Sequence, residues 1–137
     1  MHLHVQGAGV VEGDRLMVRR VIANLLSNAL RYGDSGSTVM ITVTCEAGAV
    51  VLAVTNRGDT VAPAHLDRLF DRFYRVDSAR QRPQGDGSGL GLAISKAIVL
   101  AHGGRIDVCS HKRTTVFSVH LPAMGSVALK SSSDAKV

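Results

Sequence analysis

Two hydrophobic periodicities alternate along the chain, which predicts a mixture of strands and helices. Polar and apolar residues alternate over residues 1–5 (MHLHV), as in a strand with one buried face. Apolar residues then recur with helical spacing from Asp14, a good N-cap, to Tyr32, and Gly33 is placed to end this helix. We expect the buried face of the helix to consist of Val18, Ile22, Leu25, Leu26 and Ala29.

Later runs predict more strands and two further helices. Strand-like alternation predicts two hairpins, in which 38–45 pairs with 50–56 and 105–109 pairs with 114–121. A short helix is expected at Pro63, and a longer helix from Gly89 ends near Gly103. This order predicts an α+β two-layer sandwich, in which a mixed β-sheet is covered on one face by helices.

Two segments lack either periodicity. Residues 76–88 (VDSARQRPQGDGS) are polar and rich in Arg and Gly, and a segment of this kind is typical of a mobile lid over a ligand. The small, polar residues 123–137 predict a flexible tail. We therefore expect one domain over residues 1–122, with its lid at about 76–88, followed by a tail at 123–137.

Composition limits the function classes. The chain has 137 residues, of which 45% are hydrophobic, enough for the core of one domain. A net charge of +5 suits an anionic partner, such as a nucleotide, a nucleic acid or a membrane surface, without choosing among them. Aromatic residues make up only 4% and Trp is absent, which argues against a stacking platform for single-stranded nucleic acid.

Cysteine usage and hydropathy point to a cytoplasmic location. Cys45 and Cys109 are too few for a disulfide scaffold, and their apolar neighbours predict buried thiols in a reducing compartment. No apolar run approaches the ~20 residues of a membrane-spanning helix, and no signal-peptide pattern opens the chain. We expect a soluble cytoplasmic domain.

A polar stripe on the long helix is the first candidate site. Asn24, Asn28 and Arg31 lie at i, i+4 and i+7, so they share one face. Asn is a poor helix former, so two of them in mid-helix call for a reason. The face is either solvated or binds a ligand, in which case an amide oxygen suits Mg²⁺ and Arg31 suits phosphate.

A glycine cluster precedes the later helix. Gly87, Gly89 and Gly91 would let backbone N–H groups approach a ligand at the positive end of the helix dipole, where phosphate binds. A flexible loop is the alternative. The cluster is not a dinucleotide fingerprint, since a polar, unpatterned segment precedes it, and it lacks the Gly-Lys-Ser/Thr ending of a P-loop.

Two shorter segments complete the candidates. Asn56 begins N-R-G-D-T at the end of a strand, where it serves either turn formation or ligand binding. In the run LFDRFYR, Phe70 and Phe73 are expected to pack in the core. Tyr74 and Arg75 then lead into the lid, which leaves Arg75 free to reach a bound anion.

In this order, the motifs N-x-x-x-N, N-x-G, F-D-R-F-Y-R and G-x-G-L-G-L closely resemble the N, G1, F and G2 boxes of sensor histidine kinase ATP-binding domains, which have the Bergerat (GHKL) fold. The resemblance runs from about residue 3 to Leu121, nearly the whole ordered chain. The details FDRFYRVD and SGLGLAI most resemble the heavy-metal-responsive sensor kinases.

The resemblance implies roles for individual residues. Asn28 would be the Mg²⁺ ligand, and Asn56 falls where most members carry the Asp that accepts the adenine amino proton. Asn24, Arg31 and Arg75 would be catalytic, with Arg75 on the γ-phosphate. The full set with an implied ATP-binding role is Asn24, Asn28, Arg31, Tyr32, Asn56, Gly58, Thr60, Tyr74, Arg75, Gly87, Gly89, Leu90, Gly91 and Leu92.

Two departures from the family pattern concern the G1 box, which normally reads D-x-G-x-G. Here Asn56 replaces Asp, and Thr60 replaces the second Gly. An amide can still accept from the adenine amino group and donate to a ring nitrogen. The lost carboxylate charge costs on the order of 1 kcal/mol. Members of the heavy-metal subgroup tend to carry Asn there, so we interpret the change as variation in a working site.

The implied function is that of a protein-histidine kinase, which presents Mg·ATP for γ-phosphoryl transfer to a His on a separate dimerisation domain. ATPase relatives of this fold carry a Glu four residues before the metal-binding Asn, whereas this chain has Asn24 there, which favours a kinase. None of the six histidines lies in a phosphoacceptor motif. His2 and His4 would form at most an incomplete metal site.

The implied partners are ATP or ADP, the dimerisation domain of the same receptor and a response regulator, with no nucleic acid. The fragment would be monomeric, and its parent would be a homodimeric inner-membrane sensor in bacteria. A degenerate nucleotide-binding or partner-docking module without kinase activity is the alternative, and Asn56 and Thr60 motivate it.

Overall fold

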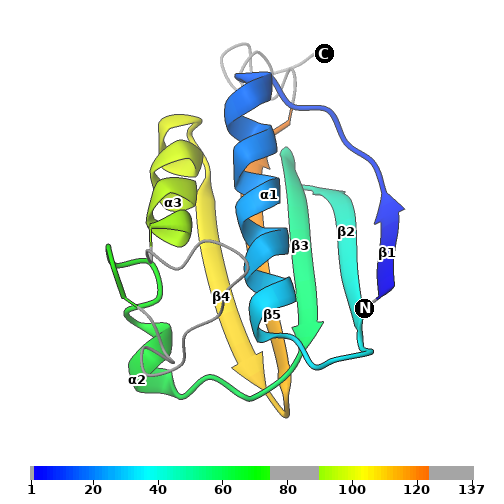
Figure 1. The fold of residues 1–137 in the computed structure, drawn as a ribbon. Helices are drawn as coiled ribbons and strands as arrows, with labels where there is room; N and C mark the ends of the chain where they lie inside the picture. Colours follow the sequence, from blue (N-terminus) through cyan, green and yellow to red (C-terminus); the bar gives the residue numbers. More distant parts are fainter. Residues whose placement is uncertain (1, 75–89, 124–137) are drawn as a thin grey trace.

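The computed structural model describes residues 2–74 and 90–123, and its helices and strands follow the predicted order (Figure 1). The predicted lid at 76–88 and all but the first residue of the predicted tail lie outside the described residues. The elements are β1 (His2–Gly7), α1 (Arg15–Tyr32), β2 (Thr38–Glu46), β3 (Ala49–Arg57), α2 (Pro63–Leu66), α3 (Gly91–Ala101), β4 (Arg105–His111) and β5 (Thr114–Pro122).

The strands form one mixed sheet in the order β1-β2-β3-β5-β4 within the described part of the chain. Both predicted hairpins are present, since β2 pairs with β3 and β4 pairs with β5 in antiparallel register. β3 also pairs antiparallel with β5, from Ala49 opposite Pro122 to Arg57 opposite Thr114. β1 lies at the edge and pairs parallel with β2, a contact that strand periodicity does not predict.

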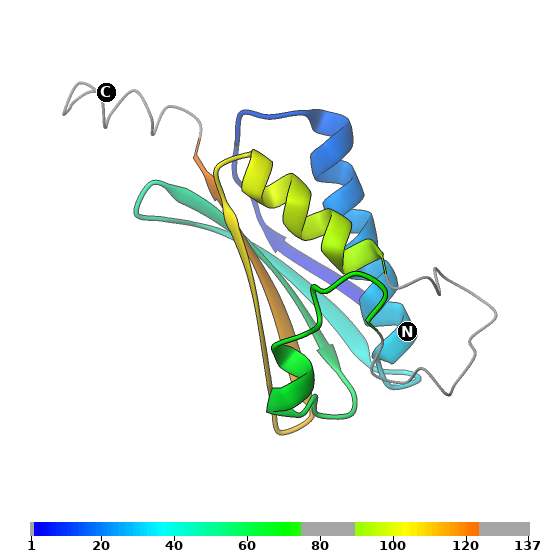
Figure 2. The same ribbon diagram turned by 90° about the vertical axis from the view of Figure 1, so that its left-hand side faces the viewer.

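Helices α1 and α3 lie side by side on one face of the sheet, which confirms the predicted two-layer α+β fold (Figure 2). The core between the layers is apolar and comes from both helices and strands. Its buried members are Val21, Leu25, Ala29, Val39, Ile41, Val54, Ile98, Val99, Ile106, Phe117 and Val119.

The caps of α1 explain why its predicted boundaries are correct. The Asp14 carboxylate accepts hydrogen bonds from the backbone N–H groups of Leu16 and Met17, at 2.9 and 3.2 Å. At the other end, the Gly33 N–H donates to the Ala29 carbonyl at 2.8 Å. Both caps satisfy backbone groups that a helix end leaves without partners.

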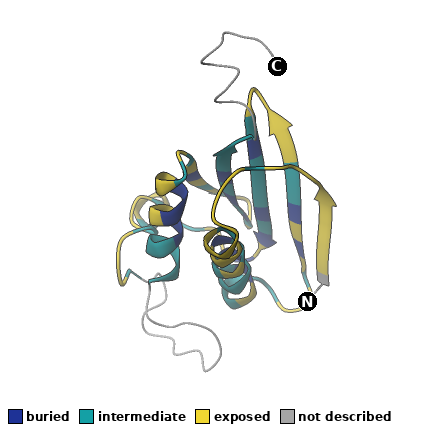
Figure 3. Ribbon diagram, turned by 90° about the horizontal axis from the view of Figure 1, so that it is seen from above, coloured by how far each residue is buried: buried dark blue, intermediate teal, exposed yellow. Residues whose placement is uncertain are grey.

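The buried face of α1 differs from the predicted one. Val21, Leu25 and Ala29 are buried, whereas Val18, Ile22 and Leu26 are half-buried. The reason is that α3 covers one flank of α1, while the opposite flank faces the edge strand β1, in which residues 3–7 are exposed (Figure 3). The buried stripe is therefore rotated toward α3.

Three predictions of burial are wrong. Cys45 and Cys109 are exposed. Cys45 lies near the tip of the β2–β3 hairpin, which projects beyond the helices, and Cys109 alternates with residues that face the helices (Figure 2). Phe73 is 66% exposed, although Phe70 packs against the core with its ring edge-on to Phe117.

No helix in the described ranges has the length and hydrophobicity needed to span a membrane.

Candidate functional site

Several of the predicted site residues lie at the same end of the helical layer. The C-terminal half of α1, the end of β3 and the N-terminus of α3 meet there (Figure 1). Arg75, Gly87 and Gly89, which were also predicted to bind ATP, lie outside the described residues. The site is therefore built from the residues that the three converging ends carry.

Asn24 joins the two helices of the site. Its side-chain amide donates to the Gly91 carbonyl and to the Ser95 hydroxyl, each at 3.1 Å. Ser95 is fully buried, and sequence analysis did not identify it. The amide nitrogen of Asn24 is thus used within the fold, and its oxygen is the atom left for a ligand.

Asn28 and Arg31 continue the same face of α1. Both are half-buried. The Nε atom of Arg31 is buried and has no hydrogen-bond partner in the part of the chain that the structure describes. Leaving such a group unsatisfied costs about 1–3 kcal/mol, so an anionic ligand at this position would relieve an existing cost. This is the feature that most directly indicates a phosphate site.

The end of β3 packs against the end of α1. Asn56 is 4% exposed and lies opposite Thr115 in the β3–β5 register. The Gly58 N–H donates to the Arg113 carbonyl at 3.0 Å. A Cβ atom at Gly58 would come within 2.4 Å of the Tyr32 carbonyl oxygen, so only glycine fits without a backbone shift. The close approach brings Asn56 and the last turn of α1 to one place.

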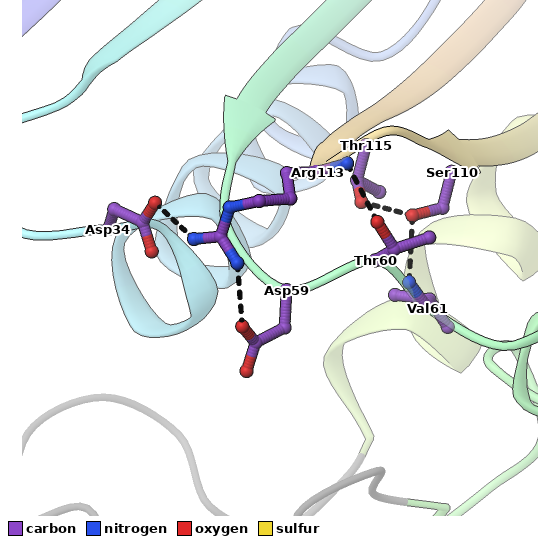
Figure 4. A network of polar contacts seen from close by, with 7 residues as sticks. All are labelled: Asp34, Asp59, Thr60, Val61, Ser110, Arg113 and Thr115. Atoms are coloured by element: carbon purple, nitrogen blue, oxygen red, sulfur yellow. Dashed lines mark hydrogen bonds and ion pairs between the residues drawn. The ribbon is translucent and has the colours of Figure 1, made fainter.

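Thr60 has a structural partner that its sequence position does not reveal. Its hydroxyl accepts a hydrogen bond from the Arg113 N–H at 2.7 Å. The Arg113 guanidinium bridges two carboxylates, with 2.6 Å to Asp34 and 3.1 Å to Asp59 (Figure 4). These contacts, with Asp34 first and then Asp59, raise the pKa of Arg113. Sequence analysis did not identify this network.

Tyr74 is held by His65 in α2 and by Arg68, which lies just after that helix. Its hydroxyl hydrogen-bonds to Nδ1 of His65. The guanidinium carbon of Arg68 lies 4.7 Å from the centre of the Tyr74 ring, within the range of a cation–π contact. Tyr74 is therefore packed against its own segment in the structure.

The N-terminus of α3 completes the described site. The helix begins at Gly91, and its N-cap residue is Leu90, whose apolar side chain cannot accept hydrogen bonds from the first turn. No acidic residue lies in that first turn. The N–H groups of Gly91 and Leu92 are therefore suited to an anionic ligand, as are those at other helix N-termini.

The described part of the site supplies few ligands for a metal ion. The described residues contain no group of three or more His, Cys, Asp or Glu that could hold a metal ion. Mg²⁺ typically needs only one or two protein oxygens when substrate phosphates supply the others. The amide oxygen of Asn28 is consistent with that mode.

Comparison with known proteins identifies the family. The family model of histidine kinase-, DNA gyrase B- and HSP90-like ATPases matches residues 13–125. The sensor histidine kinase CusS of Escherichia coli (strain K12) is 54% identical over 113 residues, which are 82% of this chain and 23% of CusS. The probable sensor kinase SilS of Salmonella typhimurium is 49% identical over 115 residues, 84% of this chain and 23% of SilS.

A solved structure of a sensor histidine kinase is also similar to this chain. The mycobacterial sensor histidine kinase MprB matches with a TM-score of 0.72 and 28% sequence identity, covering 88% of this chain and 82% of that one. The chain spans about a quarter of the length of CusS and SilS. Because the family model matches most of the chain, the chain belongs to the histidine kinase-, DNA gyrase B- and HSP90-like ATPases, as the ATP-binding catalytic domain of a sensor histidine kinase.

Proposed function

We propose that this domain binds Mg·ATP between α1 and the N-terminus of α3, and presents the γ-phosphate to a histidine on a dimerisation domain outside this chain. The observation that carries the proposal is the buried Nε of Arg31, which lacks a hydrogen-bond partner among residues 2–74 and 90–123. It lies on the face of α1 that Asn24 joins to the start of α3. Family membership supports ATP as the anion.

The proposed contacts divide the nucleotide into two halves. Arg31, Arg75 and backbone N–H groups over 87–92 would hold the phosphates, and Asn24 would support them through its free oxygen. Asn56 would read the adenine through its amide, with Tyr32, Gly58, Thr60 and Tyr74 around the nucleoside. The tight packing of Gly58 on Tyr32 supports this adenine side.

The Mg²⁺ ion would be held by the Asn28 amide oxygen together with phosphate oxygens. When bound, it would supply positive charge that neutralises the triphosphate. The cations of Arg31 and Arg75 would add to that charge. The protein thus contributes mainly positioning and electrostatic stabilisation, as phosphoryl transfer requires.

The site favours transfer over hydrolysis. Helix α1 contains neither Asp nor Glu, so it offers no carboxylate base for water. The side-chain amide of Asn24 already donates hydrogen bonds to the Gly91 carbonyl and the Ser95 hydroxyl, and an amide takes up no proton at neutral pH. A neutral imidazole needs no such base to attack a phosphoryl group. Asn24, Arg31 and Arg75 are the proposed catalytic residues.

The proposal extends to the partners, oligomeric state and location of the domain. Its partners would be ATP or ADP, the phosphoacceptor domain of the same receptor and a response regulator, without nucleic acid. The domain would be monomeric by itself, in the cytoplasmic part of a homodimeric bacterial inner-membrane sensor. The resemblance of its F and G2 boxes to those of heavy-metal-responsive kinases supports a metal as the stimulus, read by a segment outside this chain.

Titration calorimetry with a non-hydrolysable ATP analogue, with and without Mg²⁺, tests the proposal. We expect Mg-dependent binding that Asn28→Ala largely removes while the variant stays folded. ADP should compete with a fluorescent ATP analogue, and GDP should not. Absence of ATP binding by the wild-type chain would overturn the proposal.

A second experiment tests the direction of transfer. With labelled ATP, we expect no acid-labile phosphohistidine on this chain alone, and labelling of a separately added dimerisation domain from the same receptor. Phosphohistidine on the chain itself would contradict the assignment of the acceptor to another segment.

The alternative of a degenerate docking module now has less support. It rested on Asn56 and Thr60, and the Thr60 hydroxyl has a defined partner in the Arg113 N–H. A steeply salt-dependent affinity for DNA, without nucleotide binding, would favour that alternative.

A further inference from the structure

We infer that Arg113, in the turn between β4 and β5, is a positioning residue that fixes the adenine side of the nucleotide site and thereby sets base selectivity. The inference rests on the proposed function and extends it from binding of a triphosphate to recognition of the base. Arg113 itself is not expected to touch the nucleotide. It acts through the loop that follows β3.

Three contacts join Arg113 to that loop, and a fourth joins it to Asp34 after α1. Its carbonyl accepts from the Gly58 N–H at 3.0 Å, and its own N–H donates to the Thr60 hydroxyl at 2.7 Å. Its guanidinium pairs with Asp59 inside the loop at 3.1 Å, and with Asp34 after α1 at 2.6 Å (Figure 4). One residue therefore links the ends of α1 and β3 to the β4–β5 turn.

The backbone of the turn points to a role for the side chain. Lys112 and Arg113 have φ values of 48° and 63°, in the left-handed region that favours Gly and Asn. The matching turn between β2 and β3 uses the small residues Ala47 and Gly48, at φ values of 47° and 81°. Arg113 keeps a long side chain in this conformation, and the two carboxylates hold its guanidinium in place.

The linked segments form the two walls of the proposed adenine site. One wall is the last residue of α1, Tyr32, and the other is the end of β3, which carries Asn56. The Asp34 N–H donates to the Arg57 carbonyl at 2.7 Å, and Arg113 reinforces this junction from outside. Loss of the guanidinium would remove both ion pairs and keep the backbone contacts, so it would loosen the loop around Asn56 while leaving the phosphate side intact.

A matched control lies in the same hairpin. Arg105 on β4 pairs with Asp107 at 3.1 Å, and both side chains are more than half exposed. This pair joins two residues of one strand and contacts none of the proposed site. Arg105→Met therefore removes the same charge as Arg113→Met and one ion pair in place of two, without disturbing the loop.

The experiment measures the affinities of wild type, Arg113→Met and Arg105→Met for three Mg²⁺ complexes by calorimetry. The ligands are ATP, inosine triphosphate, which lacks the adenine amino group, and tripolyphosphate, which lacks the nucleoside. For Arg113→Met we expect ATP affinity to fall about fivefold and the preference for ATP over inosine triphosphate to shrink. Tripolyphosphate affinity should change less than twofold, and Arg105→Met should match wild type.

Two further variants distinguish a specific loss of base preference from misfolding. Arg113→Lys should recover part of the base preference, because an ammonium can still pair with one carboxylate. Asp34→Asn weakens the shorter ion pair and leaves Arg113 in place, and we expect it to reduce the base preference in the same direction.

The outcomes separate the two proposals. If wild type binds ATP and Arg113→Met keeps the wild-type preference for ATP over inosine triphosphate, the inference is wrong and the proposed function stands. An equal loss of affinity for all three ligands would also overturn it, because that pattern indicates general loss of structure. If wild type does not bind ATP, the proposed function fails, and the inference fails with it.

Discussion

The side-chain amide of Asn24 on α1 donates a hydrogen bond to the hydroxyl of Ser95 on α3, at 3.1 Å. The two residues are 71 positions apart in the sequence. Because the same amide also binds the Gly91 carbonyl, it holds the start of α3 against the polar face of α1. A residue expected only to bind a ligand therefore also aligns the two helices that would bind it.

Replacing Ser95 by Ala should destabilise the domain by about 1 kcal/mol, because the half-buried Asn24 amide loses one of its two acceptors. Urea denaturation would measure the change. Mg·ATP affinity should also fall, since Asn24 and the start of α3 are held less firmly. Ser35→Ala, at an exposed position, serves as the control and should stay within about 0.5 kcal/mol of wild type. Equal effects of both variants would contradict the bridging role of Ser95.

Replacing Arg31 by Met should change stability and binding in opposite directions. The buried Nε has no acceptor among the described residues, so an apolar side chain of similar length removes a cost of about 1–3 kcal/mol. We expect the denaturation midpoint to stay or rise, while Mg·ATP affinity falls about tenfold or more through loss of a charge-assisted bond. A variant that loses stability and keeps its ATP affinity would show that Arg31 is structural.

His102 ties the far ends of the two helices together. Its Nε2 accepts from the Asp14 N–H at 3.1 Å, and its Nδ1 lies 2.8 Å from the Ile98 carbonyl, to which it donates. His102→Ala should therefore cost about 1–2 kcal/mol in unfolding free energy, measured by urea titration. His111→Ala, exposed at the end of β4, is the control, with an expected change within about 0.5 kcal/mol. ATP affinity should be unaffected by either change, because both lie away from the proposed site.

Much of the fold could be predicted because its signals are local. The cap at Asp14 and the apolar spacing up to Tyr32 define α1 without tertiary information. The parallel pairing of β1 with β2 could not be predicted, because it joins segments separated by the whole of α1. The exposure of Cys45 also depends on how far the helices extend over the sheet, which periodicity does not record.

The candidate site could likewise be predicted only in part. The shared face of Asn24, Asn28 and Arg31 follows from helical spacing alone. Arg113 pairs with carboxylates 79 and 54 positions away, and exposed charges carry no periodic signal. Ser95 offered a weak signal, as a hydroxyl side chain in an otherwise largely apolar helix.

The approach of β3 to α1 provides the sharpest test of the adenine side. Gly58→Ala would place a Cβ atom within 2.4 Å of the Tyr32 carbonyl oxygen, and a backbone oxygen cannot move aside as a flexible side chain can. We expect a loss of about 1–3 kcal/mol in stability, together with weaker ATP binding, because the end of β3 must shift away from α1. Gly91→Ala is a matched control for stability alone, since Gly91 belongs to the proposed phosphate site: its Cβ would meet the Asn24 side chain no closer than 3.7 Å, an ordinary contact, and alanine favours the helix. Urea denaturation of both variants and calorimetric titration of Gly58→Ala would measure the effects. Wild-type stability and ATP affinity in Gly58→Ala would mean that the two walls of the site are not held together at this contact.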